Sequence, residues 1–228
     1  MCSEMIELQK QAAARAAAVF IRDGMTIGMG TGSTVYYLIR EMGRMVASGM
    51  RLRAVVTSER SRSLAEANGI PVLLPEDVSR IDLAIDGVDE IDSSFCAVKG
   101  GGGALMREKI VAFKADEVIW IMDESKLAER LGSFPLPVEV LPYGYGWAAE
   151  KIRKLGGHPV LRAKDGQIFH TDNGNYIFDV TFGQNAEYRS AAAAVRLIPG
   201  VLETGFFDSI CSRILVGTGE GVKEIRNE

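Results

Sequence analysis

The chain has 228 residues, of which 47% are hydrophobic and 25% are charged, and its formal net charge is −4. This length exceeds that of a typical domain, so we expect one large domain, or one large and one small domain, with a substantial core. The negative net charge excludes a general electrostatic attraction to nucleic acid. An acidic ligand such as a phosphate ester would therefore have to be held by local loops and single lysines.

The cysteine and histidine content argues against disulfides and metal sites. Cys2, Cys96 and Cys211 are widely spaced and form no CxxC or Cys/His cluster, and the two histidines lie far apart. The N-terminus lacks a charged-then-apolar signal pattern, and no apolar run reaches membrane-spanning length. These features predict a cytoplasmic protein with no membrane and no nucleic-acid partner.

The first segments predict an anion site. Residues 4–22 are alanine-rich with apolar positions at helical spacing, and residues 25–29 form a candidate strand. Gly30 to Thr34 (GTGST) and a helical segment from residue 35 follow, an order that aims free backbone amides and hydroxyls at an anion. A dinucleotide fingerprint would need a glycine at position 33, where serine stands.

The next segments extend an alternating pattern. Residues 53–61 predict a strand that ends in Thr57-Ser58, whereas a nicotinamide site needs an acid about 20 residues after the glycines. Glu59 lies near that position and leaves this alternative open. A helix over 61–68 and a strand over 70–75 would complete a β-α-β-α-β order, which indicates a parallel sheet with helices on both faces.

The stretch from residue 86 to residue 109 concentrates the chemistry. Asp86 follows a short apolar run at 81–85, and Lys99 follows a second run at 95–98. If both runs are strands of one open sheet, their carboxyl ends lie at the edge where ligands bind. Gly100 to Gly103 would allow a close approach of the backbone to a ligand, in front of a helix over 104–113.

Each of these features also has a purely structural interpretation. Asp86 and Asp89 are common turn residues, a run of glycines is usually a flexible loop, and Glu108 between two basic residues is usually a solvated helix charge. Only their occurrence together at two neighbouring strand ends predicts a functional site.

The remaining segments predict a second, smaller domain. Residues 117–122 form a candidate strand, and Asp123 or Ser125 is a candidate N-cap. From about residue 134 the order becomes β-α-β-β-α-β, as in ferredoxin-like α+β domains, and a strand over 212–217 would return to the first sheet. The predicted fold class is therefore α/β: a Rossmann-like parallel-sheet domain (1–132 plus 205–228) with an inserted ferredoxin-like domain (133–204).

Five motifs in this order carry a resemblance to a known family. The segments GMGTGST, DGVDE, KGGGGALMREK, FPLPVEVLP and TDNGNYIFDV resemble ribose-5-phosphate isomerase of the A type, from about residue 5 to about residue 225. The resemblance implies an aldose–ketose isomerase of the non-oxidative pentose phosphate pathway. Such an enzyme interconverts D-ribose 5-phosphate and D-ribulose 5-phosphate through an enediolate. It also implies a homodimer or homotetramer that needs no cofactor and no metal.

The resemblance also implies roles for single residues. Glu108 would be the base, Lys99 and the amides of Gly100 to Gly102 would stabilise the developing oxyanion, and Asp86, with Asp89 beside it, would open the sugar ring. Lys10 and Lys126 match lysines near the substrate phosphate. The implied substrate-binding set is Lys10, Thr31, Gly32, Ser33, Thr34, Asp86, Gly87, Val88, Asp89, Lys99, Gly100, Gly101, Gly102 and Lys126.

The sequence departs from the family pattern at three places. It has four glycines where Gly-Gly-Gly-Ala is common, Val88 where alanine is commoner, and an unusual segment from Tyr143 to Trp147. The last departure leaves details of the small domain and of oligomer contacts open.

Two other functions share parts of this pattern. A sugar-phosphate sensor domain of a repressor would share the phosphate loop, but it would need a basic helix-turn-helix segment and would give Glu108 no role. A nicotinamide dehydrogenase is opposed by the glycine spacing and by Thr57-Ser58.

Overall fold

The computed structural model describes residues 3–183 and 186–227, so Cys2 lies outside the described residues. The chain divides into two compact units. The first comprises residues 1–88, 107–126 and 210–228, and the second comprises residues 89–106 and 127–209. The sequence predicted boundaries at 132/133 and 204/205, which differ from the limits of these two compact units. Whether the expected parts are separate domains stays a prediction.

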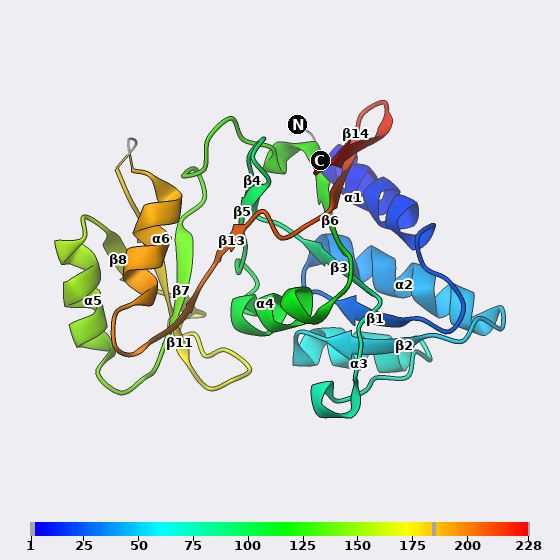
Figure 1. The fold of residues 1–228 in the computed structure, drawn as a ribbon, viewed down its shortest axis with the longest axis horizontal. Helices are drawn as coiled ribbons and strands as arrows, with labels where there is room; N and C mark the ends of the chain where they lie inside the picture. Colours follow the sequence, from blue (N-terminus) through cyan, green and yellow to red (C-terminus); the bar gives the residue numbers. More distant parts are fainter. Residues whose placement is uncertain (1–2, 184–185, 228) are drawn as a thin grey trace. The chain divides into compact units, whose positions relative to one another are not determined.

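The first unit is built on a six-stranded sheet in the order β15-β14-β6-β3-β1-β2 (Figure 1). The five strands from β14 to β2 run parallel, and β15 pairs antiparallel with β14 at one edge. Their bounds are β1 Thr26–Met29, β2 Arg53–Val56, β3 Leu83–Gly87, β6 Val118–Asp123, β14 Arg213–Thr218 and β15 Gly221–Arg226. The parallel α/β class predicted from the sequence is confirmed, whereas β15 was not anticipated.

Helices cover both faces of this sheet. On one face the strand residues Ile27 and Met29 share a core with the alanines of α1 and the apolar residues of α2. On the other face Gly28 lies against α4, where an added Cβ would be 2.5 Å from Val111 Cγ1. The helices are α1 Ser3–Ala18, α2 Ser33–Ala47, α3 Glu59–Ala67 and α4 Leu105–Lys114, with the 3₁₀ turns η1 Pro75–Asp77 and η2 Glu124–Lys126.

Two local expectations for the first unit were wrong. The strand expected over 70–75 is reduced to a single bridge between Ala54 and Val72, because Pro71 and Pro75 have no N–H to donate to a ladder. The strand expected over 53–61 ends at Val56, because Ser58 caps α3 by accepting a hydrogen bond from an amide in its first turn.

The second unit contains a four-stranded antiparallel sheet in the order β12-β7-β11-β8. Two helices follow β7 and β11 in the chain, so the β-α-β-β-α-β order of a ferredoxin-like unit is confirmed. Side chains of α5 and α6 share a core with the alternate β7 residues Leu136, Val138 and Val140. The elements are β7 Leu136–Val140, α5 Tyr145–Lys154, β8 His158–Leu161, β9 Ala163–Lys164, β10 Gln167–Ile168, β11 Tyr176–Thr181, α6 Tyr188–Arg196 and β12 Val201–Thr204.

A small antiparallel sheet corrects the expected position of Lys99. It consists of β4 Glu90–Ile91, β5 Cys96–Val98 and β13 Phe206–Asp208, in the order β13-β5-β4. The strand before Lys99 is therefore not a neighbour of β3 in the central sheet. Only eight residues separate Gly87 from Cys96, whereas a parallel crossover needs about a dozen or more.

The single strand expected over 201–207 is in fact divided. Gly205 separates β12 from β13, and these two strands belong to different sheets. The amide of Gly205 donates to Pro137 O (2.6 Å), while its carbonyl accepts from Lys99 N (2.8 Å). Within residues 3–183 and 186–227, no helix is long and apolar enough to cross a membrane.

Candidate active site

In the first unit, the loop after β1 presents the start of α2 to solvent. Gly32 is the N-cap of α2 with φ 131°, and it has no side chain with which to cap the helix. Gly32 and Ser33 are exposed, whereas Thr34 is only 8% exposed. The first amides of α2 and the helix dipole therefore face outward in an arrangement that favours a bound anion.

Asp86 fixes the base of this loop. It lies inside β3, not beyond it, and is only 4% exposed. Its Oδ1 accepts hydrogen bonds from Thr31 N (3.0 Å) and Gly87 N (2.7 Å). The approach is so close that a Cβ on Gly30 would lie 1.8 Å from this oxygen. Asp86 is therefore a buried carboxylate tied to the loop and not a turn residue.

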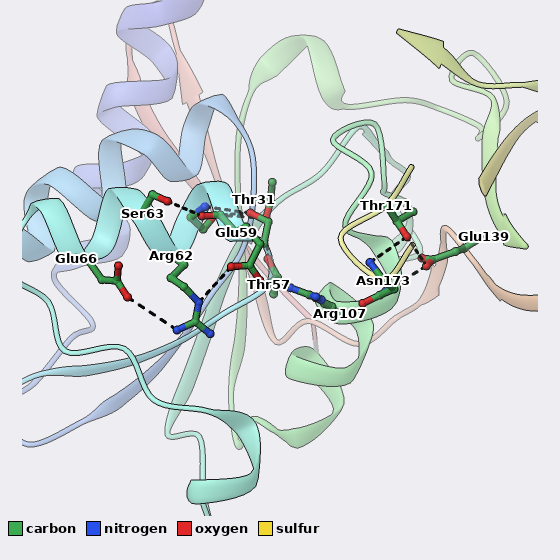
Figure 2. Close-up of polar contacts among 12 residues, drawn as sticks. Thr31, Thr57, Glu59, Arg62, Ser63, Glu66, Arg107, Glu139, Thr171 and Asn173 are labelled. Carbon is green, nitrogen blue, oxygen red and sulfur yellow. Dashed lines mark hydrogen bonds and ion pairs between the residues drawn. The ribbon is translucent and has the colours of Figure 1, made fainter. Parts of the chain in front are cut away.

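The Thr31 hydroxyl points into a cluster of other hydroxyls (Figure 2). Its Oγ1 lies 2.8 Å from Thr57 Oγ1 and 2.8 Å from Ser58 Oγ, and Ser61 Oγ donates to Gly30 O (2.8 Å). The residues that follow β2, from Thr57 to Ser61, thus hold the loop after β1 through hydroxyl hydrogen bonds. From the sequence, Thr57-Ser58 counted only against a nicotinamide site, and this supporting role was not predicted. The hydroxyl-rich run from 57 to 61 was the signal for this support.

The two candidate phosphate lysines lie in the first unit and differ in their surroundings. Lys10 on α1 donates from Nζ to Glu7 Oε1 (2.7 Å), and Tyr37 OH donates to Glu7 Oε2 (2.6 Å). These two hydrogen bonds, that from Lys10 first, hold the pKa of Glu7 below its ordinary value. Lys126 ends η2 and is half-buried, and no described residue forms an ion pair with it.

Glu108 lies in the first turn of α4 and is only 4% exposed. This burial excludes its interpretation as a solvated helix charge. Its neighbour Arg107 donates to Glu59 Oε1 (2.9 Å) at the start of α3 (Figure 2). A buried carboxylate early in a helix is suited to proton transfer, because burial limits its exchange of protons with bulk water.

In the second unit, Lys99 and the glycine loop lie close to Asp89 in the chain and in space. Lys99 is 2% exposed, and its Nζ lies 5.4 Å from the centre of the Phe207 ring. Gly101 N donates to Asp89 Oδ2 (2.7 Å). One of the three glycine amides expected to face a substrate therefore serves to hold Asp89 in this structure.

Metal ligation finds no support in the described part of the chain. No group of three or more His, Cys, Asp or Glu side chains there could hold a metal ion. Cys96 and Cys211 are buried and carry free thiols, and burial raises the pKa of Cys211 to about 12. The thiols are therefore poor nucleophiles at neutral pH.

The fold and these groups define a class of protein: an α/β protein with a helix N-terminus that favours a bound anion and with buried carboxylates at Asp86 and Glu108. Residues 53–221 match the family model described as ribose 5-phosphate isomerase A (phosphoriboisomerase A). The chain belongs to this family, as its motifs predicted.

Relatives and solved structures resemble the chain over nearly its full length. Ribose-5-phosphate isomerase A of Bacillus mycoides is 45% identical over 216 residues, which cover 94% of this chain and 98% of the relative. The structure of ribose 5-phosphate isomerase A from Methanocaldococcus jannaschii is 37% identical, with a TM-score of 0.90 over 96% of this chain and 98% of that one. A D-ribose-5-phosphate isomerase solved in complex with phospho-erythronic acid is 36% identical, with a TM-score of 0.93 over 100% of both chains.

Proposed function

We propose that the chain interconverts D-ribose 5-phosphate and D-ribulose 5-phosphate through an enediolate. The observation that carries this proposal is the buried carboxylate of Glu108 in a chain that matches isomerases from end to end. Only two residues separate Asp86 from Asp89, and only four separate Gly103 from Glu108. The proposed groups are therefore close neighbours along the chain.

Glu108 is the proposed base. After the sugar ring opens with help from Asp86, the Glu108 carboxylate takes the proton from C2, and the electrons of that bond form the C1–C2 double bond while O1 gains negative charge. A proton then passes from O2 to O1, so that O1 becomes a hydroxyl and C2 becomes the carbonyl carbon, while Glu108 returns its proton to C1. Such positioned acid–base catalysis typically contributes about 10²–10⁴-fold.

Lys99 is the proposed counter-charge for the enediolate. Its burial means that a developing oxyanion beside it would be poorly screened by water. The amides of Gly100 and Gly102 would add hydrogen bonds, because the Gly101 amide already donates to Asp89. Losing one such donor typically costs roughly 2.7–4 kcal/mol of barrier stabilisation. Phospho-erythronic acid, bound by the similar solved enzyme, is a phosphate ester whose planar carboxylate resembles an enediolate. That ligand supports the assignment of a site that binds both a phosphate group and an enediolate-like negative charge.

The phosphate group is assigned to the loop Thr31 to Thr34 and to the two lysines. The first amides of α2 supply hydrogen bonds and the positive end of a helix dipole. Lys126 and Lys10 would add charge. Gly87 and Val88 complete the proposed binding set as the link between Asp86 and Asp89.

The decisive experiment follows ketose formation from ribose 5-phosphate in the presence of EDTA. Wild-type protein should turn over, and Glu108→Gln should lose nearly all turnover while ribose 5-phosphate still raises its melting temperature. Glu150→Gln, the same change at an exposed position of α5, should behave as wild type. Wild-type turnover by Glu108→Gln would remove Glu108 as the base.

The sensor alternative is not favoured, because the relatives that cover nearly the whole chain are isomerases. It would gain support only if ribose 5-phosphate stabilised the wild-type protein without being converted. A homodimer or homotetramer and a cytoplasmic location stay predictions, to be checked by light scattering and by cell fractionation.

A further inference from the structure

An arginine of the second unit, Arg162, donates hydrogen bonds to the glycine loop, residues 100–103. Arg162, in the connection between β8 and β9, forms a two-pronged ion pair with Asp179 of β11: Nε lies 2.9 Å from Oδ2, and Nη2 lies 2.5 Å from Oδ1. The remaining nitrogen, Nη1, donates to Gly100 O (2.8 Å) and to Gly101 O (3.3 Å). The Arg162 side chain is only 13% exposed, so water competes weakly for these bonds.

A second contact comes from the same hairpin. Phe169 packs against Gly103 so closely that a Cβ on Gly103 would lie 2.5 Å from Phe169 Cζ. Gly103 also has φ +83°, which only glycine adopts readily. The guanidinium of Arg162 lies 5.8 Å from the centre of the Phe169 ring. Phe169 N also donates to Arg162 O (2.9 Å), so both contacts belong to one closed hairpin.

The segment after Phe169 is anchored as well. Glu139 of β7 is completely buried, and its Oε1 accepts hydrogen bonds from Thr171 Oγ1 (3.0 Å), Asn173 Nδ2 (3.1 Å) and Asn175 Nδ2 (2.8 Å) (Figure 2). The hairpin that carries Arg162 and Phe169 is thereby fixed to the sheet. It can hold the glycine loop as a rigid support.

Pinning two carbonyl oxygens also orients two amides. A trans peptide is planar, and its C=O and N–H point in opposite directions. The carbonyl of Gly100 shares a peptide with the amide of Gly101, and the carbonyl of Gly101 shares one with the amide of Gly102. By holding these two carbonyl oxygens, Arg162 therefore also fixes the directions of the Gly101 and Gly102 amides. The Gly101 amide is the one that holds Asp89.

Glycine peptides need such a support. Gly101 and Gly102 are exposed and have no Cβ to restrict rotation of their peptides. Ordering the backbone of such residues costs conformational entropy, and glycine loses the most. An unanchored loop of this composition would sample flipped peptides, with carbonyl oxygens directed where the amides now point.

We propose that Arg162 is a positioning residue for the isomerisation: it holds the peptides of Gly100 and Gly101 so that the amides of the glycine loop face the enediolate and Asp89. The inference rests on the proposed function, because it assigns the loop to the reacting oxygens. Among the described residues, the Arg162 side chain contacts Gly100, Gly101, Asp179 and the Phe169 ring. Its effect belongs to the turnover step, since an oxyanion gains from these amides only as charge develops.

The test compares Arg162→Ala and Arg162→Lys with Arg189→Ala. Arg189 pairs with Asp208 in the same unit (2.7 Å) and donates to Cys96 Sγ (3.3 Å), and no contact described for it reaches the glycine loop. Its replacement therefore removes an arginine ion pair without touching the loop. Arg162→Ala should lower kcat by roughly 10²-fold, the usual result of a displacement of about 1 Å at a reacting centre, with KM within about twofold. Arg162→Lys should stay impaired, because an ammonium cannot bridge the Asp179 carboxylate and both carbonyls.

Two readouts separate positioning from a general loss of stability. Guanidinium chloride, added well below denaturing concentrations, should restore part of kcat to Arg162→Ala and leave Arg189→Ala unchanged. Amide hydrogen exchange over residues 99–106 should be faster in Arg162→Ala and slowed again by guanidinium. Wild-type kcat together with unchanged exchange in Arg162→Ala would overturn the proposal.

The outcomes also distinguish this inference from the proposed function. If wild-type protein does not convert ribose 5-phosphate, the proposed function fails, and so does the assignment of Arg162 to that reaction. Exchange over 99–106 would then still decide whether Arg162 holds the loop. If Arg162→Ala does not fold, Arg162→Lys and Asp179→Asn take its place, and normal kcat in both would overturn the proposal.

Discussion

Replacing Gly30 by alanine tests whether the position of Asp86 depends on its close packing against the loop after β1. The new Cβ would lie 1.8 Å from Asp86 Oδ1, whereas real Cβ contacts stay beyond 3.0 Å. The carboxylate would therefore have to retreat by at least 1.2 Å, the difference between these distances. That retreat would lengthen the hydrogen bonds from Thr31 N and Gly87 N, now 3.0 Å and 2.7 Å.

The expected magnitudes follow from this displacement. Hydrogen bonds to charged groups contribute about 1.5–3 kcal/mol each, and overpacking costs about 1–3 kcal/mol, so Gly30→Ala should lower the free energy of unfolding by about 2–4 kcal/mol. Misplacing Asp86 by about 1 Å should lower kcat/KM for ribose 5-phosphate by roughly 10²-fold. Denaturant unfolding and a coupled ketose assay measure the two quantities.

Two controls decide the interpretation. Gly146→Ala places the same methyl group in open space on α5, where it should stabilise by about 0.4–1 kcal/mol or leave stability unchanged. Adding Gly30→Ala to Asp86→Ala should cost much less than Gly30→Ala alone, because the clashing carboxylate is gone. Wild-type stability and kcat/KM in Gly30→Ala would refute the reasoning.

Three further results are expected. Lys99→Ala should lower kcat far more than it raises KM, and a rise in KM alone would make Lys99 a binding residue. Lys126→Ala should raise KM more than Lys10→Ala, because Lys10 already shares its charge with Glu7 at 2.7 Å, and equal effects in steady-state kinetics would contradict this. Burial raises the pKa of Tyr188 to about 12 from an ordinary value of about 10, so its contribution to stability should be complete below about pH 10 and lost as the pH rises through about 12. Tyr188→Phe should remove that part of the alkaline decline in unfolding free energy, and an unchanged decline would exclude it.

Features set by neighbouring residues could be predicted from the sequence. The glycine-rich segment from Gly30 to Thr34 lies between a strand and a helix, and both were located from apolar spacing alone. The helix that carries Glu108 was expected over 104–113 and spans Leu105–Lys114. The β-α-β-β-α-β order of the second unit was likewise readable, because each element has its own periodicity.

Features that depend on distant partners could not be predicted in the same way. The strand before Lys99 has the composition of a buried parallel strand, yet it pairs antiparallel with β13, more than 100 residues later. The division at Gly205 follows from its hydrogen bonds to Pro137 and Lys99. No local pattern marks Arg162 as a partner of Gly100 and Gly101, which precede it by about 60 residues.

By itself, the sequence determined the α/β class, the family, and the identities of Asp86, Lys99 and Glu108 as the candidate groups. Tertiary structure alone decided that Thr31 anchors its loop through the hydroxyls of Thr57 and Ser58 and that Arg162 holds the glycine peptides. The physical reason is the range of the interactions. Periodicity and capping act over one or two turns of chain, whereas strand pairing and buried hydrogen bonds join segments whose separation leaves no trace in local composition.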